Sequence, residues 1–209
     1  MRAPLARTSF AVLPTAARPV ETIAGECRSW RFRPHFHAGD EVVDIHAGRA
    51  RLRLPQSQLE VAAGDTVVVP AGTVHRFEPI DGSGWAFTSR FVPPATCKTP
   101  TERPFGARVK AMLIERATLH TDMEALARAC AVSVGHLGRI FRRETGTGLH
   151  NFHVLLALHR AKALLRDQAG IAEAALDAGF YDQAHLNREF VRTFGMTPAA
   201  FRAGWSVAA

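Results

Sequence analysis

Three histidines and one glutamate near the start of the chain have the types and spacing of a metal-binding set. His35 and His37 are two residues apart, so on an extended strand their side chains point to the same side. Glu41 keeps that parity, and His75 follows the turn signal Pro70-Ala71-Gly72, which would place it on another strand. Three imidazoles and a carboxylate that converge suit zinc, nickel, iron or manganese. The sequence therefore predicts a metal site made of these four residues.

The second set of chemically informative residues is a helical pattern that occurs twice, offset by 49 positions. Each copy has a short helix, a tight turn at residues 130–133 or 179–182, and then a basic helix. This is the layout of a helix-turn-helix, whose second helix fits the major groove of B-DNA. The pattern predicts DNA binding at two neighbouring groove segments. The recurring residues are Glu124, His136, Leu137, Arg139, Phe141, Arg143 and Gly146, which return as Glu173, His185, Leu186, Arg188, Phe190, Arg192 and Gly195.

The basic helices are expected at residues 134–144 and 183–193, with leucine and phenylalanine inward and the polar side chains outward. Arginine can bond both acceptors of guanine, and asparagine those of adenine, so Arg188 and Asn187 are candidate base readers. Gly135 and Gly138 provide no side chain for readout, so the first helix is expected to rely more on phosphate contacts and DNA shape. The predicted DNA-binding residues are His136, Arg139, Arg142, Arg143, Gln183, His185, Asn187, Arg188 and Arg192.

The elements that must position these residues form an α+β protein of two domains. Residues 1–92 are predicted to be a small β-barrel or sandwich, because short strand patterns at 50–54, 66–69 and 85–91 lie between frequent glycines. Val43, Ile45, Leu52 and Leu54 are its expected core. Prolines at residues 93–106 indicate a semi-rigid linker.

Residues 107–209 are predicted to be all-α. Thr121 and Glu124 have the spacing of a capping box, with Thr121 as the N-cap. A long helix at residues 149–166 joins the two repeats, and Pro198 is well placed as the first residue of a final helix.

Composition excludes several other classes of protein. The formal net charge is +7, spread over both halves, so charge alone does not locate the DNA-binding part. The three cysteines form no Cys-x-x-Cys pair, which fits a reducing compartment. No apolar run has the length of a signal peptide core or a membrane span, so we expect a cytoplasmic protein with no membrane partner.

Residues 107–205 resemble the double helix-turn-helix domain of the AraC family of bacterial transcription regulators. The similarity rests on the sequence of residues 171–180, on Asp182-Gln183, and on Phe194-Gly195-Met196-Thr197-Pro198. It implies sequence-specific promoter binding, with recognition helices in successive major grooves. The positions that match the base readers of the family are Gly135, Gly138, Arg139, Ala184, Asn187 and Arg188, so the two glycines and the alanine are departures.

Residues 35–48 and 64–75 resemble the two motifs of the cupin superfamily, which is a small β-barrel. All four usual metal-ligand types are present, although Pro79 stands where the second motif commonly ends in asparagine. AraC-type regulators often carry a cupin-like sensory domain, so the two resemblances reinforce each other. Regulatory cupins also often hold an organic effector and no metal, so a pocket lined by these histidines is the alternative. Arg33, Arg51 and Arg53 are candidate partners of an anionic effector, but strand alternation places the last two outside.

We therefore interpret the chain as a sequence-specific DNA-binding transcription regulator and not as an enzyme. A small molecule or metal in the cupin domain would bias how the helical domain engages promoter DNA. The family resemblance implies a homodimer. The alternative is a metal-dependent cupin enzyme, such as a dioxygenase or isomerase, fused to a DNA-binding tail. A third interpretation, a nonspecific nucleic-acid binder, predicts equal affinity for scrambled DNA.

Overall fold

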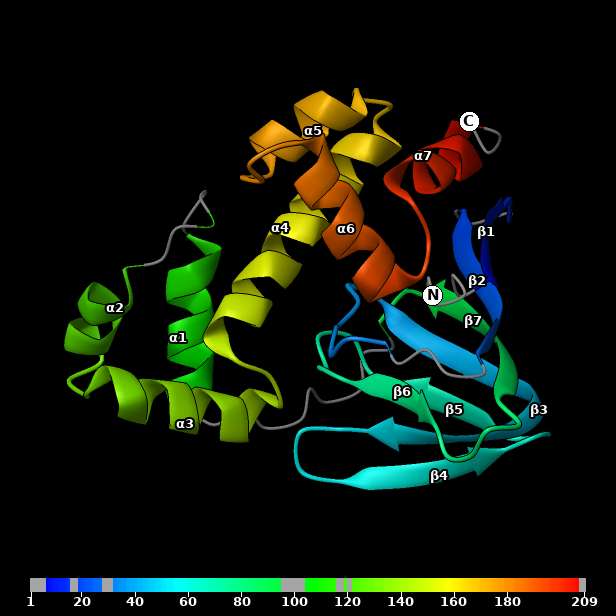
Figure 1. Cartoon of the computed structure of the whole chain (residues 1–209), viewed down its shortest axis with the longest axis horizontal. Helices are drawn as coiled ribbons and strands as arrows, with labels where there is room; N and C mark the ends of the chain where they lie inside the picture. Colours follow the sequence, from blue (N-terminus) through cyan, green and yellow to red (C-terminus); the bar gives the residue numbers. More distant parts are fainter. Residues whose placement is uncertain are drawn as a thin grey trace.

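The structure, a computed structural model, describes residues 7–15, 19–27, 32–94, 104–115, 119 and 122–206. A β domain at the N-terminal end packs beside a helical region, and the helix at the C-terminal end returns to the first strand (Figure 1). This arrangement confirms the predicted α+β fold class. Residues 95–103, which make up most of the predicted linker, and Thr121 lie outside the described residues. Strand β7 ends at Val92 and helix α1 begins at Pro104.

The described strands form one antiparallel sheet with the order β1-β2-β7-β3-β4, in which β5 and β6 also pair with β3. Strand β3 turns from one side of the domain to the other after a register shift between Ile45 and Ala47. Gly48 has φ +70°, and a Cβ there would lie 2.0 Å from the carbonyl oxygen of Gly84, so this bend requires glycine. The strands are β1 (Arg7–Leu13), β2 (Val20–Cys27), β3 (Asp40–Arg53), β4 (Gln58–Ala62), β5 (Thr66–Val69), β6 (Arg76–Pro79) and β7 (Trp85–Val92).

The interior of the β domain is filled by aliphatic and aromatic side chains. Val43, Ile45 and Leu52 are buried as predicted, whereas Leu54 is half-buried at the end of the strand pattern. The rings of Trp85 and Phe87 stack with their centroids 4.4 Å apart. Aromatic side chains of this size leave little free volume inside so small a barrel.

Two helix-turn-helix units flank a long central helix. Helices α2 and α3 form the first unit and α5 and α6 the second, while α4 joins them and contacts α1, α3, α5, α6 and α7. None of the described helices has the length and hydropathy needed to cross a membrane. The helices are α1 (Pro104–Ile114), α2 (Met123–Ala129), α3 (Val134–Thr145), α4 (Leu149–Arg166), α5 (Ile171–Asp177), α6 (Gln183–Phe194) and α7 (Pro198–Ser206).

The sequence repeat corresponds to a structural repeat. Ser133 caps α3 and Asp182 caps α6, each by accepting a hydrogen bond from the backbone N–H three residues later. Both helices end at a glycine with a left-handed backbone, at φ 76° for Gly146 and 74° for Gly195. The anchors Leu137, Phe141, Leu186 and Phe190 are all fully buried. The two basic helices are therefore held in place by equivalent side chains.

The predicted N-cap of α2 is wrong by one residue. Asp122, not Thr121, occupies that position, and its side chain accepts a 2.8 Å hydrogen bond from the backbone N–H of Ala125. Aspartate and threonine are both good caps, and the helix starts where the carboxylate reaches the third backbone N–H.

The β domain packs against α4, α6 and α7. The side chain of Asn151 donates a hydrogen bond to the carbonyl of Pro34 at 3.1 Å. His159 on α4 bonds the carbonyl of Phe36 through Nε2 at 3.0 Å, and its ring stacks on the Phe36 ring at 4.5 Å. Phe201 on α7 packs against Phe10 on β1 with ring centroids 4.8 Å apart. Contacts over long sequence separations thus join the two domains.

The buried ring of His159 predicts acid sensitivity of this contact. Burial, with the nearby charge of Lys162, lowers the pKa of His159 to about 3, whereas an unfolded histidine titrates near pH 6.5. A histidine whose pKa is lower in the folded than in the unfolded state contributes stability that is fully present above the unfolded pKa. This contribution to the free energy of unfolding is lost as pH falls from about 6.5 towards about 3. In His159→Gln the amide keeps a donor for the Phe36 carbonyl but gains no proton. Urea unfolding of wild type and His159→Gln at pH values from about 7 to about 4 measures how the free energy of unfolding depends on pH. The slope for His159→Gln should be shallower than that of wild type by an amount that corresponds to at most about one proton.

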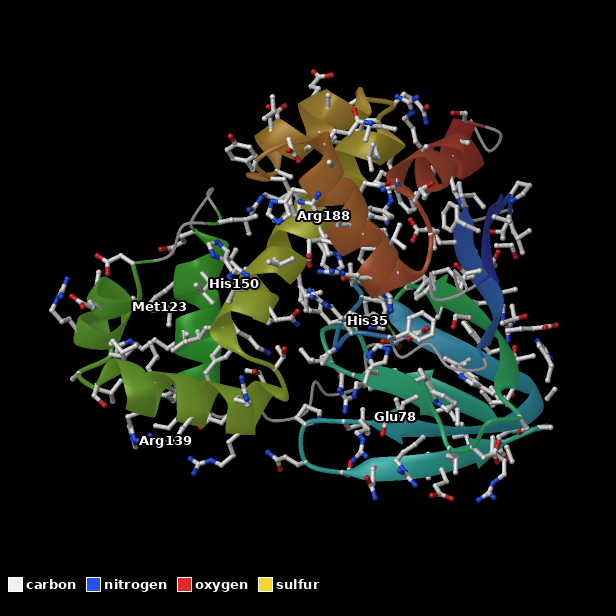
Figure 2. All side chains as sticks on the ribbon, in the orientation of Figure 1. His35, Glu78, Met123, Arg139, His150 and Arg188 are labelled. Atoms are coloured by element: carbon white, nitrogen blue, oxygen red, sulfur yellow. The ribbon has the colours of Figure 1, made fainter. Side chains whose placement is uncertain are left out.

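The matched control for this experiment is His150→Gln, because His150 is exposed on the same helix (Figure 2). It removes a histidine from the surface of α4 and so controls for the histidine-to-glutamine change itself. Equal slopes for wild type and His159→Gln would show that His159 does not contribute to the acid response.

Candidate metal centre and DNA-reading helices

The structure brings His35, His37, Glu41 and His75 together inside the β domain. Figure 2 labels His35, which marks the position of this cluster. One ligand atom from each of the four residues lies within 4.8 Å of the others, and all four are buried. His35 and His75 lie side by side in an isolated antiparallel bridge. The backbone N–H of each donates to the backbone carbonyl oxygen of the other, with N···O distances of 2.8 Å. Glu41 comes from the start of β3, opposite Val69 and Phe91.

Two of the imidazoles have the tautomer that metal binding requires. Nδ1 of His35 lies 2.7 Å from the carbonyl oxygen of Arg33, and Nδ1 of His75 lies 3.0 Å from that of Thr73. A carbonyl oxygen only accepts, so Nδ1 carries a proton, and in the neutral ring Nε2 then presents a lone pair to the cluster. These backbone contacts also fix the orientation of both rings.

The atoms that face one another in the cluster lack hydrogen-bond partners. Nε2 of His75 lies 2.8 Å from Oε2 of Glu41, and Nε2 of His37 lies 3.5 Å from the same oxygen. The three atoms are buried, and none of these contacts has hydrogen-bond geometry. Lone pairs at this distance repel each other unless a cation or a proton lies between them. The four residues therefore fit a metal ion.

The protonation states of the cluster agree with this fit. Burial, with the neighbouring His75, lowers the pKa of His35 to about 4, and burial and the adjacent His35 lower that of His37 well below its usual value. For Glu41, burial raises the pKa, but the interactions with His75, His35 and Ser89 together outweigh it and leave the pKa below its usual value. At neutral pH the site thus offers neutral imidazoles from His35 and His37 and a carboxylate from Glu41, which are the ligating forms.

The free space beside the cluster is small. The cavity there has a volume of about 20 Å³, enough for one water molecule or an ion but not for an organic effector. Its walls include the rings of Phe32, Trp85, Phe87, Phe91 and Phe194. Phe194 is the last residue of α6, and its ring centroid lies 6.3 Å from that of His35. A helix of the second helix-turn-helix unit therefore forms part of the wall of this cavity.

A salt bridge adds to the contact between α6 and the β domain. Arg33 lies two residues before His35, and its NH1 is 2.6 Å from Oε2 of Glu189 on α6. Arg51 and Arg53, expected on the outer face, pair with Glu60 and Glu78 on neighbouring strands. Sequence reasoning did not foresee the roles of Phe194 and Glu189, because neither stands in a pattern that refers to the β domain.

The predicted DNA-binding residues lie on the surfaces of α3 and α6. Figure 2 shows Arg139 on the outer side of α3, away from the β domain, and Arg188 on α6. All nine predicted residues are exposed except His185, which is half-buried with its ring edge-on to Phe180 at 5.2 Å. NH1 of Arg192 lies 3.3 Å from Oε1 of Glu189 on the same helix. The exposed residues are His136, Arg139, Arg142, Arg143, Gln183, Asn187, Arg188 and Arg192.

Comparison with known proteins identifies both parts of the chain. Residues 19–108 match the sequence model of a family described as the AraC-like ligand binding domain, and residues 126–204 match one described as a helix-turn-helix domain. The HTH-type transcriptional regulator GlxA of Rhizobium meliloti (strain 1021) is 34% identical over 105 residues, which are 47% of this chain and 32% of that protein. The arabinose operon regulatory protein of Salmonella typhimurium is 30% identical over 89 residues, which are 42% of this chain and 32% of that protein.

Among solved structures, a transcriptional regulator with an AraC-type DNA-binding domain from Chromobacterium violaceum is 23% identical, with a TM-score of 0.47, and the match covers 51% of this chain and 96% of that one. The chain spans about a third of the length of the two curated relatives named above. Both are named as regulators, in agreement with the prediction that the chain is not an enzyme. The two family matches and the paired helix-turn-helix units show that the chain belongs to the AraC family of transcription regulators and carries a cupin-like N-terminal domain.

Proposed function

We propose that the chain is an effector-responsive regulator that binds promoter DNA sequence-specifically in the cytoplasm. The observation that carries this proposal is the pair of capped basic helices, α3 and α6, with equivalent buried leucine and phenylalanine anchors and exposed polar outer faces. Residues 1–92 act as the sensor and 107–209 as the DNA-binding domain, and the linker of residues 93–106 runs into the first turn of α1 at Pro104. Family resemblance supports a homodimer formed through the sensor.

The two helices contribute differently to readout in this proposal. On α6, Arg188 and Asn187 are exposed one position apart and can each form paired hydrogen bonds with a base edge. On α3, Gly135 and Gly138 provide no side chain, so Arg139 with its neighbouring arginines acts mainly on phosphates. The first unit then fixes the position of the protein, and the second selects the sequence.

The histidine cluster is proposed to hold one zinc, nickel, iron or manganese ion. His35, His37, Glu41 and His75 would be its ligands, supported by their short contacts without hydrogen bonds and by the fixed tautomers. A bound ion would supply a buried positive charge that stabilises the site. We assign the ion a structural or sensing role, because Phe194 and the filled barrel leave no room beside it for an organic substrate.

Alanine at position 188 tests the assignment of readout. Arg188→Ala should weaken binding to a fragment of the chain's own promoter region by about 1–3 kcal/mol, roughly a factor of 5 to 150, while binding to scrambled DNA falls far less. Fluorescence anisotropy at a fixed salt concentration measures both affinities. Arg49→Ala is the control, because Arg49 is a similarly exposed arginine on the β domain. Equal losses on both DNAs would instead indicate a nonspecific nucleic-acid binder.

Metal analysis of the purified chain tests the histidine cluster. Wild type should contain about one equivalent of a transition metal, and His37→Ala less than about a tenth of that, because a missing ligand lowers metal affinity steeply. His46→Ala is the matched control, since His46 is exposed on β3 and should leave the metal content unchanged. Wild type that stays metal-free after incubation with each of the four metals would refute the site.

A further inference from the structure

A cleft of about 470 Å³ lies between the β domain and helices α4 and α7. Its volume falls in the range of small-molecule sites, whereas the cavity of about 20 Å³ beside the histidines does not. The cleft is lined by polar and aromatic side chains from both domains. Those that bear on its chemistry are Glu21, His37, Phe91, His159, Lys162, Arg166 and Trp205.

One carboxylate in the cleft, that of Glu21, accepts hydrogen bonds from three side chains of the helical domain. Nζ of Lys162 lies 3.0 Å from Oε2 of Glu21. Arg166 donates to Oε1 through Nε at 2.9 Å and through NH2 at 2.6 Å, and the indole N–H of Trp205 reaches the same oxygen at 3.2 Å. The structure therefore already shows how this part of the cleft binds a carboxylate.

The charged groups that line the cleft are one negative charge short of neutrality. Lys162 and Arg166 are cations, and Glu21 is the single carboxylate among the described lining residues. His159 is neutral, since burial holds its pKa at about 3. Glu41 also stabilises the charge of Lys162, but it lies in the histidine cluster and does not line the cleft. Lys162 is 7% exposed, with its ammonium 4.9 Å from the ring centroid of Phe201 and 5.1 Å from that of Phe194. Glu21 compensates this buried ammonium, so the surplus positive charge is that of Arg166, whose side chain is 39% exposed and can be reached by an anion in the cleft.

The remaining walls suit an apolar body. Phe91, Val92, Pro94 and Trp205 line the cleft, and Trp205 also lies against the Arg166 guanidinium at 5.3 Å. His37 and Phe91 line both the cleft and the cavity of the histidine cluster. A molecule in the cleft would thus contact one of the proposed metal ligands.

We propose that this cleft binds a small organic carboxylate, which is the effector of the regulator. Its acid group competes with Glu21 for Lys162, Arg166 and Trp205, and its apolar part packs on Phe91 and Trp205. Because the lining residues come from both domains, occupation changes the free energy of the contact that holds α4 on the β domain. This inference rests on the proposed regulator function and names its ligand class.

Binding of octanoate and benzoate to the full chain tests the proposal, with octanamide and benzamide as neutral counterparts. Isothermal titration calorimetry should detect at least one of the two acids and neither amide. Arg166→Gln should weaken acid binding by about tenfold or more, and Glu21→Gln should strengthen it by a similar factor because the competing carboxylate is gone. Arg90→Gln is the control, since this exposed arginine on β7 pairs with Asp44 and does not line the cleft.

Several results would overturn the inference: no binding of either acid, equal binding of acids and amides, or unchanged acid affinity in Arg166→Gln. Inorganic phosphate that binds as tightly as the acids would also overturn it, because the cleft would then be a general anion site. A saturating acid should change promoter affinity by about threefold or more in wild type but not in Arg166→Gln, and no change in wild type refutes the effector role. Wild type that binds its promoter but no acid leaves the regulator proposal standing, and Arg188→Ala should lose promoter binding while it keeps acid binding.

Discussion

The arrangement of the two domains depends on the buried ammonium of Lys162. Burial lowers the pKa of this lysine, and the carboxylate of Glu21 opposes that shift by stabilising the charged form. Loss of one partner of a buried ion pair typically costs about 3–5 kcal/mol, because the other charge is then left without compensation. Helix α4 must therefore lie against strand β2, where Glu21 is found. The same carboxylate binds Arg166 and Trp205, so α4 and α7 are fixed to the β domain together.

This constraint reaches both DNA-reading helices, because α4 is the element that they share. Helices α1, α3, α5 and α6 all contact α4, and a shift of α4 against the β domain would move both helix-turn-helix units. Helix α6 has additional contacts with the β domain through Phe194, at the histidine cluster, and through the salt bridge of Glu189 with Arg33. A structural change inside the β domain would thus act directly on α6 of the second unit. Such direct contact is what a switch between two arrangements of the domains requires.

Local patterns predicted the helices that carry the DNA-binding residues, and long-range contacts stayed out of reach. The expected ranges 134–144, 149–166 and 183–193 agree closely with α3, α4 and α6, because helical periodicity, caps and C-terminal glycines are encoded within a few residues. Strand parity predicted the candidate metal ligands as one set, but of these only Glu41 lies in a named strand. His35 and His75 face each other in an isolated bridge, and His37 lies between that bridge and β3. The pairing of Glu21 with Lys162 spans 141 positions and has no local signature. Its signal is a lysine between Leu158 and Leu165 on the buried face of α4, where a charge requires a partner.

The sequence left two interpretations of the histidine cluster, a metal site or a pocket for an organic effector, and the distribution of space reconciles them. Trp85 and Phe87 stack across the interior, so the room beside the cluster suits an ion, while the volume for an organic molecule lies in the cleft on the other side of His37. The two ligands then need not compete. An ion that orders His37 would shape one wall of the cleft, so that metal and carboxylate would affect each other's binding through a shared side chain.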